Sequence, residues 1–567
     1  MKKFLFPILF LTLAGSQTIA GSGIPAEKDS LKKEHKVSLT GSLTASMQAY
    51  HVSGIPGRRE NFTWRISGNP TLNAGDFHLP LHILVGSYQD ALKQPFNKIG
   101  ISPQYKWLKV HLGFNNVEFS KLVVSQRTFL GVGVELNPLI FRLGILYGRW
   151  QKAIEPDSTS AEPFTPAFKR KGYAVKIGFG KKDRYVDFIY FKGKDDTSSL
   201  HYEPYAIPIK PQENAALGIV LRQNIARKVF LEIDGAISLF SRDILARSYD
   251  KSDLSFAEKI KPIIPLRSST QVLGALLSKI EYRGKSFKIG FGYDRITPDY
   301  ETMGIYYFQN DVQRFTLSSD WRMLKKRMTV TAKIGLEKTN LLETLTATST
   351  RTLALLNIFW MIDNNNNLNF FYSNNQQSVK DAREIPDTTY HSFTDSIHLG
   401  QAVNILSASF QHRWVKEKRN HILNFNGNYQ SSRQYNDFET SQKVYSFNFL
   451  PDYSITFEKP HFTLLAGFEY SQFIADITIA NYGPVIGITK QMLKKKMTAS
   501  LRTNVSVNYT EGEPSAITTR LFLNFSYRII SKHLLKMRLV YLHRNSRELS
   551  SATFSELQGE LGYTVQF

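Results

Sequence analysis

The feature of this sequence that most constrains its fold is a long series of segments in which apolar and polar residues alternate. Successive side chains of a β-strand point to opposite sides, so each segment predicts a strand with one apolar and one polar face. The segment 286–296 shows the pattern most clearly. Its apolar positions and the small or charged positions between them are Phe287, Ile289, Phe291 and Tyr293 against Lys288, Gly290, Gly292 and Asp294.

The alternating segments follow one another in pairs, which predicts antiparallel hairpins. Most are about 10 to 13 residues long, which suits a tilted crossing of a bilayer, whereas globular strands average about 5 to 6 residues. The predicted pairs are 129–136 with 139–150, 172–180 with 184–192, 214–224 with 228–240, 271–283 with 286–296, 312–322 with 328–338, 351–361 with 367–374, 402–414 with 420–430, 444–457 with 462–474, 479–491 with 496–509, and 517–530 with 533–544.

The connections between these segments alternate in length. Short turns include 181–183, 283–285 and 494–496, and long connections include 151–171, 193–213, 241–270 and 375–401. Outer-membrane barrels have short periplasmic turns and long extracellular loops, and a bilayer tolerates no open sheet edge. The sequence therefore predicts an all-β fold, a transmembrane antiparallel up-and-down β-barrel of about 26 strands (roughly 24 to 28) in the outer membrane.

Composition agrees with a barrel. No segment beyond the first 20 residues approaches the roughly 18 consecutive apolar residues that indicate a membrane-spanning helix, yet aromatic residues reach 13% of the chain. Barrels in lipid carry aromatic girdles at both interfaces. A large soluble β protein is the alternative, but such a protein has no reason to alternate short and long connections.

The segment 556–567 carries the most specific motif. One face is polar, and the other consists of Leu557, Gly559, Leu561, Tyr563, Val565 and Phe567. A last strand of this kind, ending in Phe, resembles the C-terminal assembly signal of Gram-negative outer-membrane β-barrels. The resemblance implies that Tyr563, Val565 and Phe567 form an assembly signal for the β-barrel assembly machinery.

The N-terminal part divides into three segments. Residues 1–20 have the basic start, short apolar run and small final residues of a secretory signal peptide. We expect 21–36 to be a periplasmic tail and 37–567 to be the barrel. Prolines interrupt the pattern within 51–126, which predicts either bent strands or a segment folded into the lumen. The pattern as a whole and the two chain ends resemble large outer-membrane barrels of the Bacteroidota type.

The charge balance bears on partners. The formal net charge is +23, which often indicates nucleic-acid binding. An exported β chain makes nucleic acid an improbable partner, so we expect outer-membrane lipid and lipopolysaccharide instead. Further outer-membrane or periplasmic subunits are also candidate partners. The chain has no cysteine, so it forms no disulfide, and we expect no cofactor.

Candidate lumen charges come from the polar faces of the clearest strands. They are Lys288, Arg502, Arg520, Arg528, Lys536 and Arg538 on the positive side and Asp294, Glu556 and Glu560 on the negative side. A low-dielectric wall focuses the field of fixed charges along a pore, and lumen charges tune selectivity. The positive excess predicts a preference for anions in an open lumen.

Two functions fit these observations. The first is a channel or conduit for solutes or an exported polymer, which the polar inner face supports. The second is a structural or accessory subunit of a complex for secretion, assembly or surface display, because the wide lumen of such a barrel needs loops or a partner to fill it. Enzyme activity is not expected, since no spacing singles out a catalytic set. Nor is a metal site expected, since Pro80 separates His78 from His82 and Asp195-Asp196 is interpreted as a solvated loop.

Overall fold

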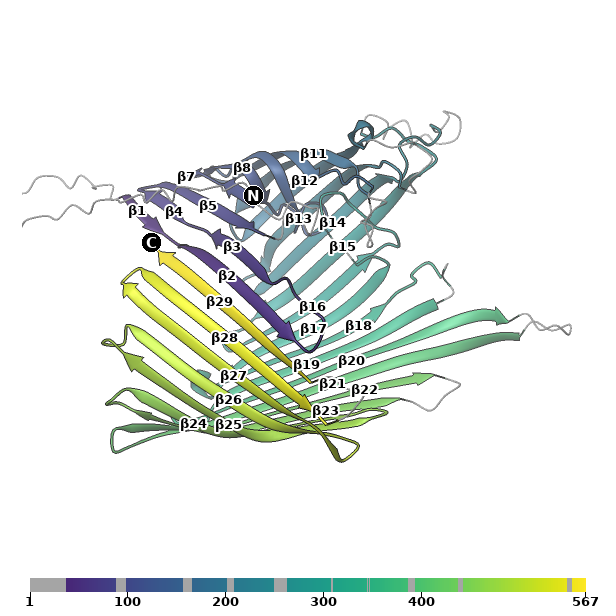
Figure 1. Ribbon diagram of the computed structural model, residues 1–567. Coiled ribbons are helices and arrows are strands. Elements are labelled where there is room, and N and C mark those ends of the chain that lie inside the picture. Colours follow the sequence, from purple (N-terminus) through teal and green to yellow (C-terminus); the bar gives the residue numbers. More distant parts are fainter. Residues whose placement is uncertain are drawn as a thin grey trace, which may run out of the picture.

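The computed structural model describes residues 37–567, apart from 88–97, 157–165, 201–208, 249–262, 307–308, 344, 346, 386–392, 437–441 and 548–552. The described chain forms one antiparallel sheet of 29 strands. β2 (Ser42–Ser53) pairs with β3 (Phe62–Gly68) on one side and with β29 (Phe554–Gln566) on the other. The sheet therefore closes, and β2 (purple) lies beside β29 (yellow) in Figure 1. The predicted signal peptide and tail lie outside the described residues.

The other strands follow in chain order. In the N-terminal part these are β1 (Val37–Thr40), β4 (Thr71–Ala74), β5 (Phe77–Gly86), β6 (Lys98–Ile101), β7 (Gln104–Tyr105), β8 (Leu108–Asn116), β9 (Thr128–Leu136) and β10 (Phe141–Gln151). They continue with β11 (Lys169–Lys181), β12 (Arg184–Asp196), β13 (Glu213–Ala226), β14 (Val229–Ser241), β15 (Thr270–Arg283), β16 (Phe287–Ile296), β17 (Val312–Met323), β18 (Met328–Lys338) and β19 (Ala347–Met361). The last are β20 (Asn366–Ile385), β21 (Phe393–Lys416), β22 (Arg419–Asn436), β23 (Lys443–Phe457), β24 (Phe462–Ile474), β25 (Thr478–Met492), β26 (Met497–Thr510), β27 (Glu513–Ile530) and β28 (His533–Ser546).

Three of the barrel's strands are interrupted. β3 and β4 are two parts of one interrupted strand, since both pair with β5. β6 and β7 form a second interrupted strand, since both also pair with β5. β1 and β2 form the third, because β1 pairs with β4 while β2 pairs with β3. Counting each interrupted pair once gives a closed ring of 26 strands, which confirms the predicted antiparallel barrel and its size. The described helical elements are two single turns, η1 (Thr197–Ser199) and η2 (Leu324–Lys326). Among the described residues, no helix has the length and apolar character needed to cross a membrane.

The predicted long connection 375–401 is wrong. β20 and β21 pair without interruption from Asn366↔His412 to Ile385↔Phe393, and the hairpin projects beyond its neighbours in Figure 1. Its outer part is rich in Asn, Gln and Ser, so it lacks the apolar alternation on which the prediction depended. Backbone hydrogen bonds between paired strands require no apolar face, so a polar hairpin can extend beyond the lipid level.

The two faces of the wall differ in chemistry. Large apolar side chains such as Val132, Tyr147 and Leu336 are 51%, 57% and 55% exposed on one face. Near the short turns this face carries stacked rings, including Tyr282 on Phe287 and Phe287 on Trp321, the latter with centroids 5.0 Å apart. An apolar band bordered by aromatic residues is the lipid-facing surface of a membrane barrel. The opposite, polar face therefore lines the lumen.

The pairing of β8 with the interrupted strand β6 and β7 is short, with two residue pairs to β6 and two to β7. The pairs with β6 are Gly100↔Gly113 and Ile101↔Leu112, whereas on its other side β8 shares nine pairs with β9. Gly113, within β8, has φ +82°, a conformation that an L side chain rarely adopts. We call this junction the β6–β8 seam.

The C-terminal strand closes the barrel in full register. β29 pairs with β2 from Ser42↔Gln566 to Ser53↔Ser555 and with β28 on its other side. Leu561 and Tyr563 are 45% and 38% exposed on the lipid-facing side, and the backbone N–H of Phe567 donates to the carbonyl of Gly41 at 3.0 Å. The residues proposed as an assembly signal thus lie at the end of the strand that joins the C-terminal part of the ring to β2.

Deletion of Phe567 is expected to lower the amount of inserted barrel severalfold, because the chain loses the residue that resembles an assembly signal. Phe567→Tyr keeps an aromatic ring at the same position and is the matched control, with near-normal insertion expected. The measurement is the outer-membrane fraction of protein that migrates differently on gels before and after boiling. Equal insertion of the wild type and the deletion variant would show that Phe567 is not part of the signal.

Candidate functional site in the barrel lumen

Two connections from the long-loop side fold into the lumen. One is 117–127, between β8 and β9, and the other comprises the described residues 297–306 and 309–311, between β16 and β17. They contact each other directly: the Tyr300 hydroxyl donates to the carbonyl of Leu122 at 2.6 Å, and the backbone N–H of Ser125 donates to the carbonyl of Gly304 at 3.2 Å. We call them the two lumen segments.

The lumen segments build an apolar core inside the barrel. Leu122, Val123 and Val124 are completely buried, and Tyr300 and Met303 are each 1% exposed. They pack against inward-facing wall residues of β9 to β17, listed here: Phe129, Leu146, Trp150, Ala174, Ile189, Phe191, Ala216, Val220, Ala236, Phe240, Leu273, Ala275, Ile296 and Val312. This part of the lumen is filled by protein rather than by water.

Glycines in the wall make room for the first lumen segment. A Cβ atom at Gly144 would lie 2.5 Å from the Phe119 ring, and one at Gly218 would lie 2.6 Å from a Val123 methyl carbon. Contacts this short force a shift of the neighbouring atoms. The glycines therefore fit this wall to the residues that rest on it.

Buried polar side chains fix the lumen segments in place. Asp234 is 4% exposed, and its carboxylate accepts from the Ser120 hydroxyl and the Lys121 backbone N–H, both at 2.7 Å. Asn214 accepts from the Thr302 hydroxyl at 3.0 Å and the Met303 backbone N–H at 3.1 Å. Each segment thus has its own buried acceptor on the wall, which specifies its position.

The wall around the lumen segments has compensated charges. Arg142 makes a bidentate pair with Asp187 at 2.7 and 2.9 Å, and Arg170 makes one with Asp195 at 2.7 and 3.1 Å. Lys176 Nζ lies 3.0 Å from Glu135. These ion pairs neutralise the charges of this part of the wall.

The opposite wall, from β23 across β29 to β3, has an excess of positive charge. Two adjoining concavities of about 740 and 440 Å³ share Ser500, Asn524 and Arg538 in their linings. Their charged lining residues are Arg65, Arg502, Arg520, Lys536 and Arg538 against Glu469 and Glu560. We call these five cations the basic wall.

The basic wall is only partly neutralised. Arg520 lies 3.9 Å from Glu469, and Arg538 stands opposite Glu560 in the register of β28 and β29. Among the described residues, Arg502 and Lys536 have no ion-pair partner. The arrangement can attract a mobile anion along the wall.

The structure brings together some of the sequence-predicted lumen charges but not all. Arg502, Arg520, Lys536, Arg538 and Glu560 share the two concavities. The others lie elsewhere: Lys288 is opposite Asp320, Asp294 is 3.3 Å from Arg314, Arg528 is exposed near the short turns, and Glu556 accepts from Tyr50 at 2.9 Å. Arg65 and Glu469 were missed, because neither lies in a segment with clean alternation.

Asp195-Asp196 is not a solvated loop. Both residues are the last of β12, and Asp195 is 4% exposed in its pair with Arg170. Asp196 accepts from the Ser198 hydroxyl at 2.7 Å. Because Arg170 occupies both Asp195 oxygens, no open cation site is left there. Among the described residues, no group of three or more potential metal ligands occurs.

One buried network has the residue types of a hydrolase triad. The Ser102 hydroxyl lies 3.1 Å from His111 Nδ1, and His111 Nε2 lies 3.0 Å from Glu135. Ser102 also donates to Asn115 at 2.9 Å, and Ser102 and His111 are only 4% and 3% exposed. A substrate cannot reach so deeply buried a hydroxyl. The network instead joins the end of β6 to β8 and β9 and so reinforces the β6–β8 seam.

The described residues of the proline-broken region 51–126 include both wall strands and part of the lumen core. Residues 51–116 include the short and interrupted strands described above, and 117–125 lie within the lumen core. His78 and His82 are both on β5, and His78 hydrogen-bonds Asn73 at 2.7 Å.

The closed sheet, the apolar outer band and the polar, partly filled lumen define a large β-barrel of the outer-membrane type. No protein-family model matches this chain, and no curated protein sequence does. Solved structures with a similar fold include the P pilus usher (PapC) translocation pore, with 10% identity over 93% of this chain and 99% of the usher chain, at a TM-score of 0.27. Pseudomonas aeruginosa OccK10 (OpdN) has 10% identity over 66% of this chain and 98% of its own, at 0.34. A bacterial polysaccharide outer membrane secretin has 10% identity over 76% and 98%, at 0.23.

Proposed function

We propose that this chain is an outer-membrane channel with a narrowed lumen that favours anionic solutes. The observation that carries the proposal is the basic wall, whose five cations face two carboxylates in adjoining concavities. The other side of the lumen is occupied by the lumen segments, and the wall residues Arg142, Arg170 and Lys176 there are in ion pairs. Mobile ions on the free side therefore encounter mostly positive charge. The short turns are periplasmic in this proposal, and the anionic partners of the outer surface are lipid and lipopolysaccharide.

The mechanism is electrostatic. Fixed charges on a low-dielectric wall raise the local concentration of counter-ions, so anions enter the lumen more readily than cations. Guanidinium groups bind carboxylates and phosphates through several parallel hydrogen bonds, so successive arginines can pass an anion along the wall. Salt weakens the effect, because the Debye length is about 8 Å at physiological ionic strength.

The test is a reversal-potential measurement in a planar bilayer with a potassium chloride gradient. The expected reversal potential has the sign of the chloride equilibrium potential, and its magnitude falls as both salt concentrations rise. A reversal potential with the sign of the potassium equilibrium potential would overturn the proposed anion selectivity.

A second function stays open because of the apolar lumen core. A barrel closed by its own segments fits an accessory role in a secretion, assembly or display complex, with the core as a gate. The same recordings separate the two functions: silence of the intact protein, with large channels after removal of the lumen segments, favours the gated barrel.

A further inference from the structure

A second basic site lies at the long-loop edge of the barrel, away from the basic wall. A cavity of about 690 Å³ is formed at the ends of β5, β6, β8, β9, β10 and β11 and by the lumen segments. The cationic residues that line it are Lys98, Arg127, Arg149, Lys152 and Arg170. No carboxylate lines it among the described residues. We call it the seam cavity, because β6 and β8 contribute to it.

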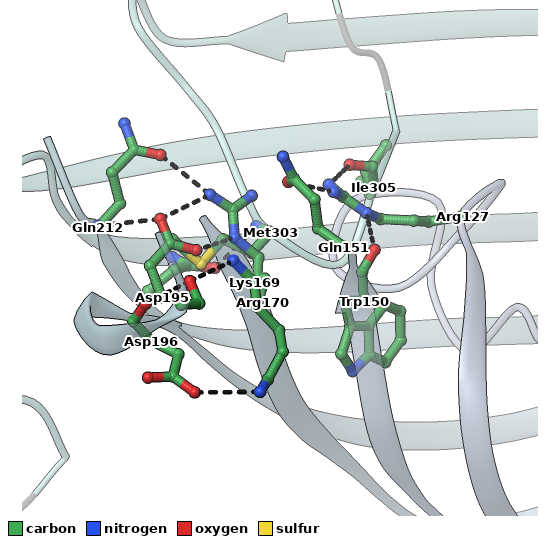
Figure 2. Close-up of polar contacts among 12 residues, drawn as sticks. Arg127, Trp150, Gln151, Lys169, Arg170, Asp195, Asp196, Gln212, Met303 and Ile305 are labelled. Carbon is green, nitrogen blue, oxygen red and sulfur yellow. Dashed lines mark hydrogen bonds and ion pairs between the residues drawn. The ribbon is translucent and has the colours of Figure 1, made fainter. Parts of the chain in front are cut away.

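Most of the positive charge of the seam cavity is uncompensated. Figure 2 shows the two central arginines: Arg170 is paired with Asp195, whereas Arg127 donates only to neutral oxygens. These are the carbonyls of Trp150 and Ile305, at 3.2 and 3.1 Å, and Gln151 Oε1 at 3.1 Å. Burial and the nearby Arg170 lower the pKa of Arg127 to about 10, which leaves it cationic at neutral pH.

The geometry of Arg127 is fixed by these contacts. Its guanidinium connects the end of β10 to the second lumen segment at Ile305, so its position does not depend on a ligand. Lys98, Arg149 and Lys152 have no ion pair among the described residues. Four of the five cations in the cavity therefore have no carboxylate partner among the described residues, so an anion there would meet uncompensated positive charge.

The cavity also has an apolar side that reaches the lipid-facing surface. Its apolar and aromatic lining residues are Leu84, Phe114, Leu130, Trp150 and Tyr306. Leu130 and Arg149 stand opposite each other and are two residues from Val132 and Tyr147, which are exposed on the lipid-facing side. Side chains two apart in a strand share a face, so part of the lining belongs to the outer surface.

We propose that the seam cavity binds a phosphate group, carried either by a small solute or by an amphiphile of the surrounding leaflet. A carboxylate brings one negative charge, whereas a phosphate monoester brings about −1.5 to −2 at neutral pH with three acceptor oxygens. That charge and geometry match several lysines and arginines around one point. The apolar rim beside the seam accommodates the chain of an amphiphile. The site does not depend on conduction, so it stands apart from the proposed channel function.

The experiment measures binding to the full-length, folded barrel. One arm titrates inorganic pyrophosphate into detergent-solubilised protein by calorimetry. The other reconstitutes the barrel in phosphatidylcholine nanodiscs with and without phosphatidic acid and detects retained lipid by native mass spectrometry. The test variant is the double exchange Lys98→Gln and Arg149→Gln. The control is Lys182→Gln, which removes one charge in an exposed turn at the opposite edge of the barrel.

The wild type is expected to bind in at least one arm, and the double variant to bind roughly 10- to 100-fold more weakly, the loss that removal of charged hydrogen bonds produces. Binding in the pyrophosphate arm alone identifies a soluble ligand, and in the phosphatidic acid arm alone a lipid headgroup. No binding in either arm overturns the proposal. An equal loss of binding in the Lys182→Gln variant would also overturn it, because the loss would then depend on the overall charge of the protein and not on the cavity. Gel migration before and after boiling checks folding, and Arg149→Gln alone replaces the double variant if insertion fails.

Discussion

Replacing Arg502, Arg520 and Arg538 with glutamate is expected to invert the ion preference of the barrel. These residues supply three of the five cations of the basic wall, which faces Glu469 and Glu560. The exchange converts a net charge of about +3 on this wall into about −3, with the charges at the same positions along the lumen. The reversal potential in a salt gradient should change sign, from that of chloride to that of potassium.

Two controls separate local charge from overall charge. The same three residues changed to glutamine should bring the preference close to neutral without inverting it. A triple exchange of Lys494, Lys495 and Lys496 to glutamate, in the short turn after β25, alters the net charge equally. That turn is exposed outside the concavities, so the reversal potential should shift far less. Inversion by the turn variant would mean that the field at the entrance, and not the basic wall, determines selectivity.

The wall of the barrel was predictable because its sequence obeys one local rule. A strand of the wall has lipid on its outer face and the polar lumen on its inner face, so its apolar and polar residues alternate with a period of two residues. The sequences of β16, β26 and β29 follow this alternation closely. Where the wall leaves the lipid, the rule no longer applies. The β20–β21 hairpin illustrates this, because its polar outer part is held by backbone pairing that no side-chain pattern reveals.

The lumen was harder to predict because its contacts join residues far apart in the chain. Tyr300 and Leu122 lie in connections separated by eight strands, and nothing in either segment indicates the other. Gly144 and Gly218 carry no sequence signal that distinguishes them from other strand glycines, yet they mark where a segment rests on the wall. Alternation along single strands predicts an inner face for Arg502, Arg520 and Arg538, but their convergence in one concavity depends on how β26 to β28 lie side by side.

The second large effect is expected from Tyr300→Ala, which should increase conductance by loosening the lumen segments. Tyr300 is 1% exposed, and its hydroxyl holds the carbonyl of Leu122 at 2.6 Å. Truncation of a buried aromatic ring costs about 3–5 kcal/mol in packed cores. The loss falls on the lumen segments, since the wall keeps all its interstrand hydrogen bonds. Single-channel recordings should therefore show larger and noisier currents, while the unfolding midpoint of the barrel changes little.

Tyr300→Phe is the matched control, because it keeps the ring in the core and removes one hydrogen bond worth about 0.5–1.5 kcal/mol. Its conductance should lie close to that of the wild type. Asp234→Ala offers an independent route to the same outcome, since it removes the carboxylate that holds Ser120 and Lys121 on β14. If both Tyr300→Ala and Asp234→Ala conduct like the wild type, the lumen segments do not limit passage, and ions cross along the basic wall alone. If both variants fold but conduct no current, the obstruction lies elsewhere in the barrel, and this result favours the accessory role over the channel function.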